Sequence, residues 1–334
     1  MSKSFFPAKR SEFLFCYDAR MANPNGDPDE NRPRIDPITH KNLVTEFRLK
    51  RTIRDYLERR MGLPVFMKEE IEADGSVKTI EGMANRYIEE TTSRKGDKEK
   101  KSKTVQREKL TKDHIDIRLF GLLFAVGGVH FKQTGPVQFG IGQSLNQVDE
   151  IQVRMTRVVP TKEEAKAGTF GEKHLLRYSF IVFHGFLNDI VAKEVNLTEK
   201  DVSSMMQAAW FGTNDLSTTS KFGQASRLLL RVNYAGTTSF IGDLDTHLHL
   251  DAKEKDFDLK KVEDISQITL NITSLLNYLD EHKKDVSSIE YAYDEALRCK
   301  CEGNEKTFNE LLRDWAKNNK IEISDLLQIW GSSN

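Results

Sequence analysis

The stretch from residue 12 to residue 60 decides the fold. It consists of EFLFCYDAR (12–20), MANPNGDPDENRPRIDPITHKN (21–42) and LVTEFRLKRTIRDYLERR (43–60). The first piece is aromatic and partly alternating, a pattern that predicts a β-strand. The second piece is rich in Pro, Asn, Asp and Gly, which predicts a long ordered loop. The third piece carries apolar residues at helical spacing, so a strand, a loop and a helix open the fold.

The predicted helix runs from about Leu43 to Arg60, with Asn42 as its N-cap. At 100° per residue, its apolar and basic side chains separate onto two faces. One face holds Leu49, Ile53, Tyr56 and Leu57, and the other holds Arg48, Arg51 and Arg54. The apolar face is expected to pack in the core, which leaves a row of guanidinium groups for a partner or for solvent.

The rest of the chain predicts a series of strands and helices with long insertions. We expect an insertion at 62–112 with a lysine-rich tip near 93–106, a short helix within 114–131, a strand, loop and strand within 135–159, a polar excursion at 160–174, a strand at 175–187, a helix at 198–211, a strand at 227–235 and three helical patterns within 256–334. This order predicts an α+β sandwich of ferredoxin or RRM-like type, with helices on one side of an antiparallel sheet.

The composition indicates a soluble globular protein. The chain has 334 residues, of which 38% are hydrophobic, enough to bury a sizeable core. The opening MSKSFFPAKR lacks the apolar run of a signal peptide, and no stretch approaches the roughly 20 apolar residues that cross a bilayer. A cytoplasmic location without membrane contact is therefore expected. The three cysteines, Cys16, Cys299 and Cys301, form neither a disulfide framework nor a zinc pattern.

Charge is unevenly distributed along the chain. The net charge of −1 at first argues against a nucleic-acid partner. Residues 32–60 hold nine Lys or Arg against four Asp or Glu (+5), residues 92–112 hold nine against three (+6), and residues 251–334 hold twelve against eighteen (−6). Such a chain can bind a polyanion on one face and a different partner on another. Charges scattered over a solvated surface would give the same counts.

Several short motifs occur in an order that is known from one protein family. They are Asn23-Pro24-Asn25-Gly26-Asp27-Pro28, Arg32-Pro33-Arg34-Ile35-Asp36, Leu43-Val44-Thr45-Glu46, Asp116-Ile117-Arg118-Leu119-Phe120-Gly121, Gly135-Pro136-Val137-Gln138-Phe139, Gly140-Ile141-Gly142-Gln143-Ser144-Leu145, Thr169-Phe170-Gly171-Glu172-Lys173-His174 and Arg227-Leu228-Leu229-Leu230-Arg231-Val232. Over about residues 10–250 the chain resembles the Cas-seven family, the RAMP-type backbone subunit of type I CRISPR Cascade complexes, and is most similar to its I-B and I-C branch.

The resemblance implies an RRM-like palm that carries fingers and thumb insertions. The palm would comprise residues 1–61, 113–152 and 176–250, the fingers 62–112, the thumb β-hairpin 153–175, and a C-terminal helical segment 251–334. It also implies partners: crRNA, target DNA, further copies of the chain in a filament, and the other Cascade subunits, namely the large subunit, the subunit that caps the crRNA 5′ end and the crRNA-processing endonuclease. No enzymatic activity, cofactor or metal is implied.

Sequence-neutral RNA binding needs contacts to phosphates and ribose, because every guide differs in sequence. The arginine face of the helix and the preceding loop suit that task, since arginine binds phosphate oxygens in pairs. The remaining RNA-binding residues are those that the resemblance implies. Together the expected residues are Asn23, Asn25, Arg32, Arg34, Thr45, Arg48, Lys50, Arg51, Arg54, His130, Phe131, Gln143, Ser144, Phe170, Lys173, Thr218, Thr219 and Lys221.

Other interpretations of these residues stay open. Phe131 and Phe170 are as well suited to a core as to stacking on bases. Asp27 and Asp29 suggest a metal-dependent ribonuclease of the related type III kind as an alternative. A third hypothesis is a structural protein that assembles without RNA, and a fourth is the backbone of an RNA-guided transposition complex. Finally, Asp243, Asp245, His247 and His249 would share one face of a strand, as metal ligands often do.

Overall fold

The computed structural model describes residues 7–72, 74–95, 98–126, 128–156 and 170–332. The chain divides into two compact units. Unit 1 comprises Met1–Ser11, Lys50–Gln138 and Phe186–Ala209, and unit 2 comprises Glu12–Leu49, Phe139–Gly185 and Trp210–Asn334. Within the described ranges, no helix is both long enough and apolar enough to cross a membrane.

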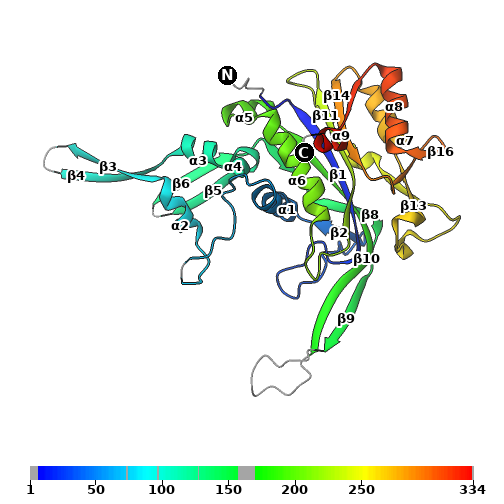
Figure 1. The fold of residues 1–334 in the computed structure, drawn as a ribbon, viewed down its shortest axis with the longest axis horizontal. Coiled ribbons are helices and arrows are strands. Elements are labelled where there is room, and N and C mark those ends of the chain that lie inside the picture. The colour runs from blue at the N-terminus through cyan, green and yellow to red at the C-terminus, as the bar shows by residue number, and fades with distance from the viewer. Residues whose placement is uncertain (1–6, 73, 96–97, 127, 157–169, 333–334) are drawn as a thin grey trace. The chain divides into compact units, whose positions relative to one another are not determined.

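Unit 2 is built on a nine-stranded sheet (Figure 1). Its strands are β1 (Ser11–Ala22), β2 (Lys41–Val44), β7 (Val137–Phe139), β8 (Gly142–Gln147), β9 (Glu150–Thr156), β10 (Phe170–Leu187), β11 (Gln224–Tyr234), β14 (Val286–Tyr293) and β17 (Glu322–Asp325). The main order is β17-β14-β11-β1-β10-β8-β2, and β7 and β9 also pair with β10. The predicted strands at 12–20, 175–187 and 227–235 are β1, β10 and β11. Strand β1 lies in the middle of the sheet, and most of its residues are buried, including the apolar run from Phe13 to Tyr17.

The two predicted long helices are present. They are α1 (Glu46–Arg59) and α6 (Glu199–Asn214). Along the chain, β1, α1, β8, β10, α6 and β11 follow one another, and other elements are inserted between them. The described residues form both helices and strands, and the strands build the nine-stranded sheet and several smaller sheets. The predicted α+β class is therefore confirmed.

The predicted start of the first helix is wrong. Residues 41–44 form strand β2, which pairs with β8, and α1 begins only at Glu46. Thr45 rather than Asn42 caps the helix, because its Oγ1 accepts a hydrogen bond from the Arg48 backbone N–H at 3.4 Å. The Asn42 amide instead donates to the Arg34 carbonyl at 2.9 Å, so it holds the preceding loop against the strand.

The predicted helical character of residues 251–334 is only partly right. Helices α7 (Thr273–Glu281), α8 (Phe308–Asn319) and α9 (Leu326–Gly331) alternate with strands. A second sheet has the order β12 (His249–Ala252), β13 (Ile268–Asn271), β15 (Arg298–Cys301) and β16 (Asn304–Thr307), and β14 and β17 extend the main sheet. Four-residue strands are too short to carry a periodic pattern. Strand β13 pairs with β15 across α7, whereas β15 and β16 form a local hairpin.

The core of unit 2 joins the main sheet to this C-terminal region. Leu14 of β1 and Phe180 of β10 belong to the same buried cluster as Leu275 of α7 and Phe308 of α8. Figure 1 shows α7 and α8 side by side. Residues 251–334 are therefore an integral part of unit 2 and not an appendage.

Unit 1 has a smaller core between hairpins and short helices. The hairpins pair β3 (Ile88–Lys95) with β4 (Lys98–Val105) and β5 (Gly121–Val126) with β6 (Val129–Thr134). The helices are α2 (Ile80–Ala84), the single 3-10 turn Asn85–Tyr87, α3 (Arg107–Asp113), α4 (Ile115–Phe120) and α5 (Asp189–Glu194). Phe66, Tyr87, Leu110, Phe124 and Phe131 lie in its core. Unit 1 thus includes the predicted insertion 62–112 and continues beyond it.

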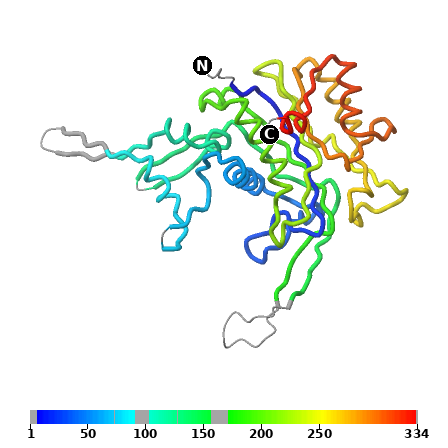
Figure 2. Tube along the Cα trace, in the orientation of Figure 1, coloured from blue at the N-terminus to red at the C-terminus, as the bar shows by residue number. Residues whose placement is uncertain are grey.

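The predicted thumb begins as a β-hairpin. Strand β9 pairs with the first residues of β10 in a register that runs from Phe170 opposite Thr156 to Leu176 opposite Glu150. Figure 2 shows the two strands extending together from the rest of unit 2. The predicted polar excursion at 160–174 lies mostly outside the described residues, as does the side chain of Phe170.

Candidate nucleic-acid interface

The loop between β1 and β2 is ordered by hydrogen bonds, as the sequence predicted. The Asp27 N–H donates to the Arg32 carbonyl at 2.8 Å, and the Leu43 N–H donates to the Arg34 carbonyl at 2.8 Å. The Asn23 N–H donates to the carbonyl of Ser220 at 2.8 Å, which joins this loop to a second one after α6. Two loops far apart in the sequence therefore form one continuous surface of unit 2.

The two predicted asparagines support this surface from within. The Asn25 Oδ1 accepts hydrogen bonds from both the backbone N–H and the Oγ1 of Thr45, each at 2.8 Å, which ties the loop to the N-terminus of α1. Asn23 is buried, and its amide donates to the Asn31 carbonyl at 2.6 Å. Both side chains fix the loop, and they thereby determine where the first turn of α1 presents Arg48.

Two cations converge on this surface, Arg48 from α1 and Lys221 from the second loop. The Lys221 Nζ donates to the Asn23 carbonyl at 2.6 Å. Burial of the ammonium group, together with the nearby charge of Arg48, lowers the pKa of Lys221 to about 8. Two like charges at a half-buried site create a positive potential that an anion would relieve.

A third cation comes from β10, where the Lys173 Nζ donates to the carbonyl of Thr219. Thr218 and Thr219 are exposed beside it. The structure therefore brings Lys173, Lys221 and Arg48 to the same pair of loops, although 125 positions separate Arg48 from Lys173 along the chain. These five expected residues lie beside the loop from Asn23 to Thr45, which itself contains the expected residues Asn23, Asn25, Arg32, Arg34 and Thr45.

Exposed apolar side chains beside these cations were missing from the prediction. Phe47, 71% exposed, precedes Arg48, and Phe222, 74% exposed, follows Lys221. Met21, 46% exposed, lies at the end of β1, where the neighbouring Arg20 N–H donates to the carbonyl of Gly223 at 2.9 Å. A Cβ at Gly223 would lie 2.4 Å from the Arg20 carbonyl oxygen, so this close approach requires glycine. The sequence signal was an aromatic residue next to a cation in each segment.

The other basic residues of α1 make contacts within unit 1. The Arg54 Nε lies 3.0 Å from Asp116 Oδ2, and both side chains are largely buried. The Arg51 Nε lies 2.8 Å from Asp55 Oδ1, one turn further along the helix. Lys50 is buried, and its Nζ donates to Gln138 Oε1 at 3.3 Å. The arginine face is therefore divided, because Arg51 and Arg54 contact carboxylates of unit 1 whereas Arg48 lies near Lys221 in unit 2.

Several further expected residues have packing or supporting positions. Phe131 is fully buried and stacks on Phe124 with ring centroids 5.5 Å apart, whereas the adjacent His130 is exposed on β6. Ser144 is also fully buried, and its Oγ accepts from the Asn42 N–H at 2.8 Å. Its neighbour Gln143 is exposed on β8.

The two remaining expected arginines belong to the loop before β2. Arg32 pairs with Glu30 at 2.7 Å on the exposed part of the loop. Arg34 is half-buried, and its Nε has no hydrogen-bond partner among the described residues.

The carboxylate of Asp27, which motivated the ribonuclease alternative, stabilises its own loop. Its Oδ1 accepts hydrogen bonds from the backbone N–H groups of Asp29 at 3.1 Å and Glu30 at 2.9 Å. Desolvation acts to raise its pKa, but these backbone hydrogen bonds outweigh that effect and lower the pKa of Asp27. Such a turn is the usual structural role of aspartate in a loop. In the parts of the chain that the structure describes, no three His, Cys, Asp or Glu residues are grouped to hold a metal.

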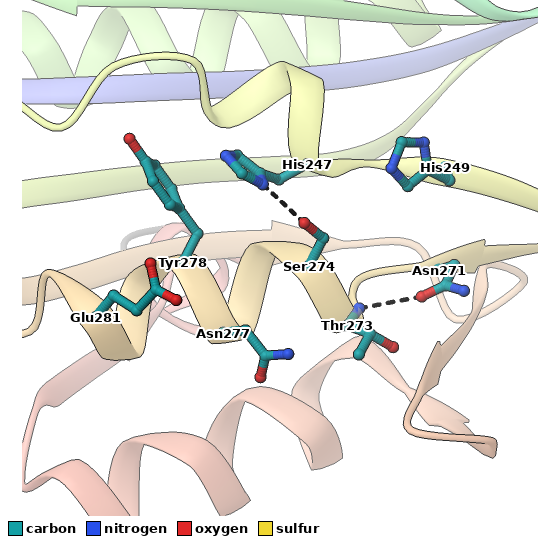
Figure 3. A pocket seen from close by; sticks show the side chains of 8 residues that line it. All are labelled: His247, His249, Asn271, Thr273, Ser274, Asn277, Tyr278 and Glu281. Carbon is teal, nitrogen blue, oxygen red and sulfur yellow. Dashed lines mark hydrogen bonds between the residues drawn. The ribbon is translucent and has the colours of Figure 1, made fainter.

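The predicted alternation of Asp243, Asp245, His247 and His249 on one strand is wrong. Leu244–His247 form a 3-10 turn, and Asp243 has a left-handed backbone, because Gly242 and Asp243 reverse the chain there. His247 stacks on Tyr278 of α7 at 4.0 Å, and its Nδ1 lies 2.7 Å from the Ser274 Oγ. Figure 3 shows both contacts at the edge of a cavity of about 370 Å³, which His249 also lines.

Asp245 points elsewhere, toward His184 of β10. His184 Nδ1 lies 3.6 Å from the Asp245 carboxylate, and His184 Nε2 lies 3.1 Å from the buried Glu12. Burial alone would lower the pKa of His184, but the hydrogen bond and charge of Glu12, assisted by Asp245, raise it. The carboxylates thus fasten β1 and β10 to the turn at 243–247.

Comparison with known proteins shows which family and which solved structures this chain is similar to. The family model of CRISPR-associated protein Cas7 matches residues 9–272. A protein of Haloferax volcanii named CRISPR-associated protein Cas7 is 28% identical over 312 residues, covering 86% of this chain and 88% of the relative. A chain of the CRISPR RNA-guided surveillance complex, pre-nicking, aligns with 93% of this chain and all of its own length, at a TM-score of 0.49 and 12% identity. A second surveillance-complex chain aligns with 92% of this chain and 99% of its own, at a TM-score of 0.47 and 13% identity.

The match to the family model extends from just before β1 to the end of β13, and so includes the loop, the start of α1 and the loop after α6. The relative at 28% identity spans most of both chains. The family inferred from the motifs is confirmed, and the chain belongs to the Cas7 family.

Proposed function

We propose that this chain is a crRNA-binding backbone subunit of a type I CRISPR surveillance (Cascade) complex. The observation that carries the proposal is the convergence of Arg48, Lys221 and Lys173 on two joined loops, beside the exposed rings of Phe47 and Phe222. Cations next to exposed aromatic rings suit a single strand, whose phosphates and bases they contact without reading sequence. Membership of the Cas7 family supports the same function.

In this proposal, each group of residues has its own task. Arg48, Lys221 and Lys173 bind phosphates, and Thr218 and Thr219 contact phosphate or ribose oxygens. Phe47 and Phe222 stack on bases or cover them from water. The base edges then stay accessible, so that pairing with target DNA, not the protein, reads the sequence. The chain acts through shape and charge and catalyses no reaction.

The architecture that we propose is an RRM-like palm with fingers and thumb. The βαββαβ order of β1, α1, β8, β10, α6 and β11 supports the palm, since ferredoxin-like domains have this order. The four strands lie in the order β11-β1-β10-β8. The hairpins β3–β4 and β9–β10 would then form the fingers and thumb. Further copies of the chain, the large subunit, the 5′-end cap subunit and the processing endonuclease complete the proposed complex, of subtype I-B or I-C.

Purification of the chain from cells that transcribe a guide RNA tests the proposed function. We expect RNA to copurify, and we expect nuclease digestion to leave fragments at a regular spacing, because each bound copy protects one segment. The RNA should dissociate at high salt, since phosphate contacts release counterions. Copurification of protein oligomers that persist after complete removal of RNA would contradict the proposal and favour assembly without RNA.

The affinity for RNA is expected to fall as the pH rises above about 8. Below that pH, Lys221 is protonated both with and without RNA. Above it, the free chain loses this proton, and binding to a phosphate must restore it, which costs up to about tenfold in affinity per pH unit. Binding to a short RNA at about pH 7, 8 and 9 measures the effect. Lys221→Arg should flatten the profile, because arginine stays charged; identical profiles would contradict the role of Lys221.

A further inference from the structure

Unit 1 exposes an apolar surface for which RNA binding has no use. Residues 69–72 and 74–81, here named the acidic ribbon, contain a β-bridge in which Ile71 and Val77 are directly opposite each other, and they end in the first residues of α2. Ile71 is 68% exposed and Val77 57%. Two aliphatic side chains that face each other across a pair of strands form one continuous patch. Single exposed apolar residues are ordinary, but a paired patch on an ordered turn suggests a contact surface.

The charges of the ribbon argue against a nucleic acid as its partner, although Arg86 outside the ribbon also pairs with Glu70 at 3.1 Å. The acidic ribbon holds five carboxylates against the one cation Lys78. Lys78 is already shared between Glu70 at 3.3 Å and Glu72 at 3.8 Å, so it offers little positive charge to an incoming phosphate. A patch with apolar residues in its middle and carboxylates at its rim fits a protein surface that is apolar in its middle and basic around it.

The same chain carries such a surface on the hairpin β5–β6. Alternate residues of this hairpin point in opposite directions, and Leu122, Phe124 and Phe131 pack in the core of unit 1. The outer side, here named the basic hairpin face, consists of Leu123, Ala125, His130 and Lys132, all of which are exposed. Leu123, 72% exposed, is directly opposite Lys132.

No carboxylate interrupts the basic hairpin face, since residues 121–134 contain no Asp or Glu. A further cation lies on the core side of the same hairpin. Arg107 is positioned over the Phe131 ring at 5.1 Å, and its Nη1 donates to the carbonyl of Lys132 at 3.3 Å.

We propose that the acidic ribbon of one copy docks on the basic hairpin face of the next copy along the RNA. The aliphatic pair Ile71 and Val77 would cover Leu123 and Ala125, and the carboxylates would surround Lys132. Because the two surfaces are different, the contact is heterologous and leaves one of each open at the ends, which is the geometry of a growing filament and not of a closed dimer. The inference rests on the proposed function, since the RNA aligns the copies.

Cooperative binding tests the contact separately from RNA affinity. The test compares the binding of the chain to two single-stranded RNAs, one long enough for several copies and one long enough for a single copy. Val77→Asp is expected to reduce cooperativity on the long RNA by about tenfold, as the loss of a central interface residue does, and to leave affinity for the short RNA unchanged. Ile190→Asp is the matched control, because Ile190 is 58% exposed on α5 of the same unit and lies outside both surfaces. Thermal unfolding shows whether each variant is folded.

Disulfide trapping identifies the partner of the ribbon. Chains with Val77→Cys are mixed with chains with Leu123→Cys, both in a Cys301→Ser background, since Cys16 and Cys299 are buried and Cys301 is partly exposed. With long RNA and a mild oxidant we expect a dimer of the two different chains, and with short RNA none.

Three results would overturn the docking. They are unchanged cooperativity in Val77→Asp, absence of the mixed dimer although RNA is bound cooperatively, and weaker binding of the short RNA, which would place the ribbon on RNA. If the ribbon instead binds another subunit of the complex, the first of these results will be observed. Failure of the unaltered chain to bind either RNA would overturn the proposed function itself. That outcome is measured on the unaltered chain and does not depend on any variant.

Discussion

Reversing the charge of Arg48 and Lys221 together, as Arg48→Glu with Lys221→Glu, is expected to weaken binding to a short single-stranded RNA by at least about 100-fold. Each charge-assisted hydrogen bond contributes about 1.5–3 kcal/mol, so two such losses exceed about 3 kcal/mol even before repulsion is counted. The dependence of affinity on salt should also become shallower by about one to two phosphate contacts. Fluorescence anisotropy across a salt series measures both quantities.

The matched control is Lys253→Glu with Lys255→Glu, which makes the same change of charge at two exposed lysines of unit 2. These lysines lie in the acidic C-terminal region, so we expect affinity to change by less than about threefold through long-range charge alone. Circular dichroism confirms that both double variants are folded. A folded Arg48→Glu, Lys221→Glu chain with unaltered affinity would show that RNA binds elsewhere.

Asp116→Ala is expected to destabilise unit 1 by about 3–5 kcal/mol. The buried carboxylate of Asp116 accepts three hydrogen bonds, from Arg54 Nε at 3.0 Å and from the backbone N–H groups of Phe66 at 2.8 Å and Met67 at 3.1 Å. Alanine would leave one largely buried guanidinium and two N–H groups without their acceptor, which is among the costliest losses in a core. Denaturant unfolding gives the free energy, and hydrogen exchange at Phe66 and Met67 localises the effect.

Asp55→Ala is the control for this prediction, because Asp55 also pairs with an arginine of α1 but both side chains are partly exposed. Exposed pairs one turn apart contribute about 0.5 kcal/mol, so its effect should be several times smaller. If Asp116→Ala lowers the free energy of unfolding by as little as Asp55→Ala does, the Asp116 cluster does not stabilise unit 1. In that case Arg54 would again be a candidate for binding RNA, and Arg54→Gln should then weaken RNA affinity.

The contrast between Arg48 and Arg54 shows which property of the site could not be predicted from the sequence, namely the partner of each arginine. Helical spacing placed Arg48, Arg51 and Arg54 on one face, and that geometry is a property of the helix itself. That Arg54 is largely buried depends on its pairing with Asp116, which is 62 positions away in the sequence. Lys221 is 198 positions from Asn23, whose carbonyl it binds. Pairings at such separations leave no local signal, and only the folded chain reveals them.

Secondary-structure elements could also be predicted only where the pattern is local. Strands β1, β10 and β11 and helices α1 and α6 are long enough for a periodic pattern, and their sequences predicted them. Strands β2, β12 and β13 have four residues each, and their stability comes from partners elsewhere in the chain. Helical patterns therefore dominated the prediction for residues 251–334, although this region also contributes strands to both sheets.

By itself, the sequence determined the α+β class, the long elements around β1 and the ordered loop from Asn23 to Asp36, because each depends on residues that are neighbours along the chain. The family could be inferred in the same way, because each motif consists of residues that are neighbours along the chain. Only the tertiary structure decided which cations gather beside Phe47 and Phe222, and that Arg54, Phe131 and Ser144 are buried. The physical reason is that burial and pairing are set by contacts between segments, and the free energy of those contacts belongs to no single segment.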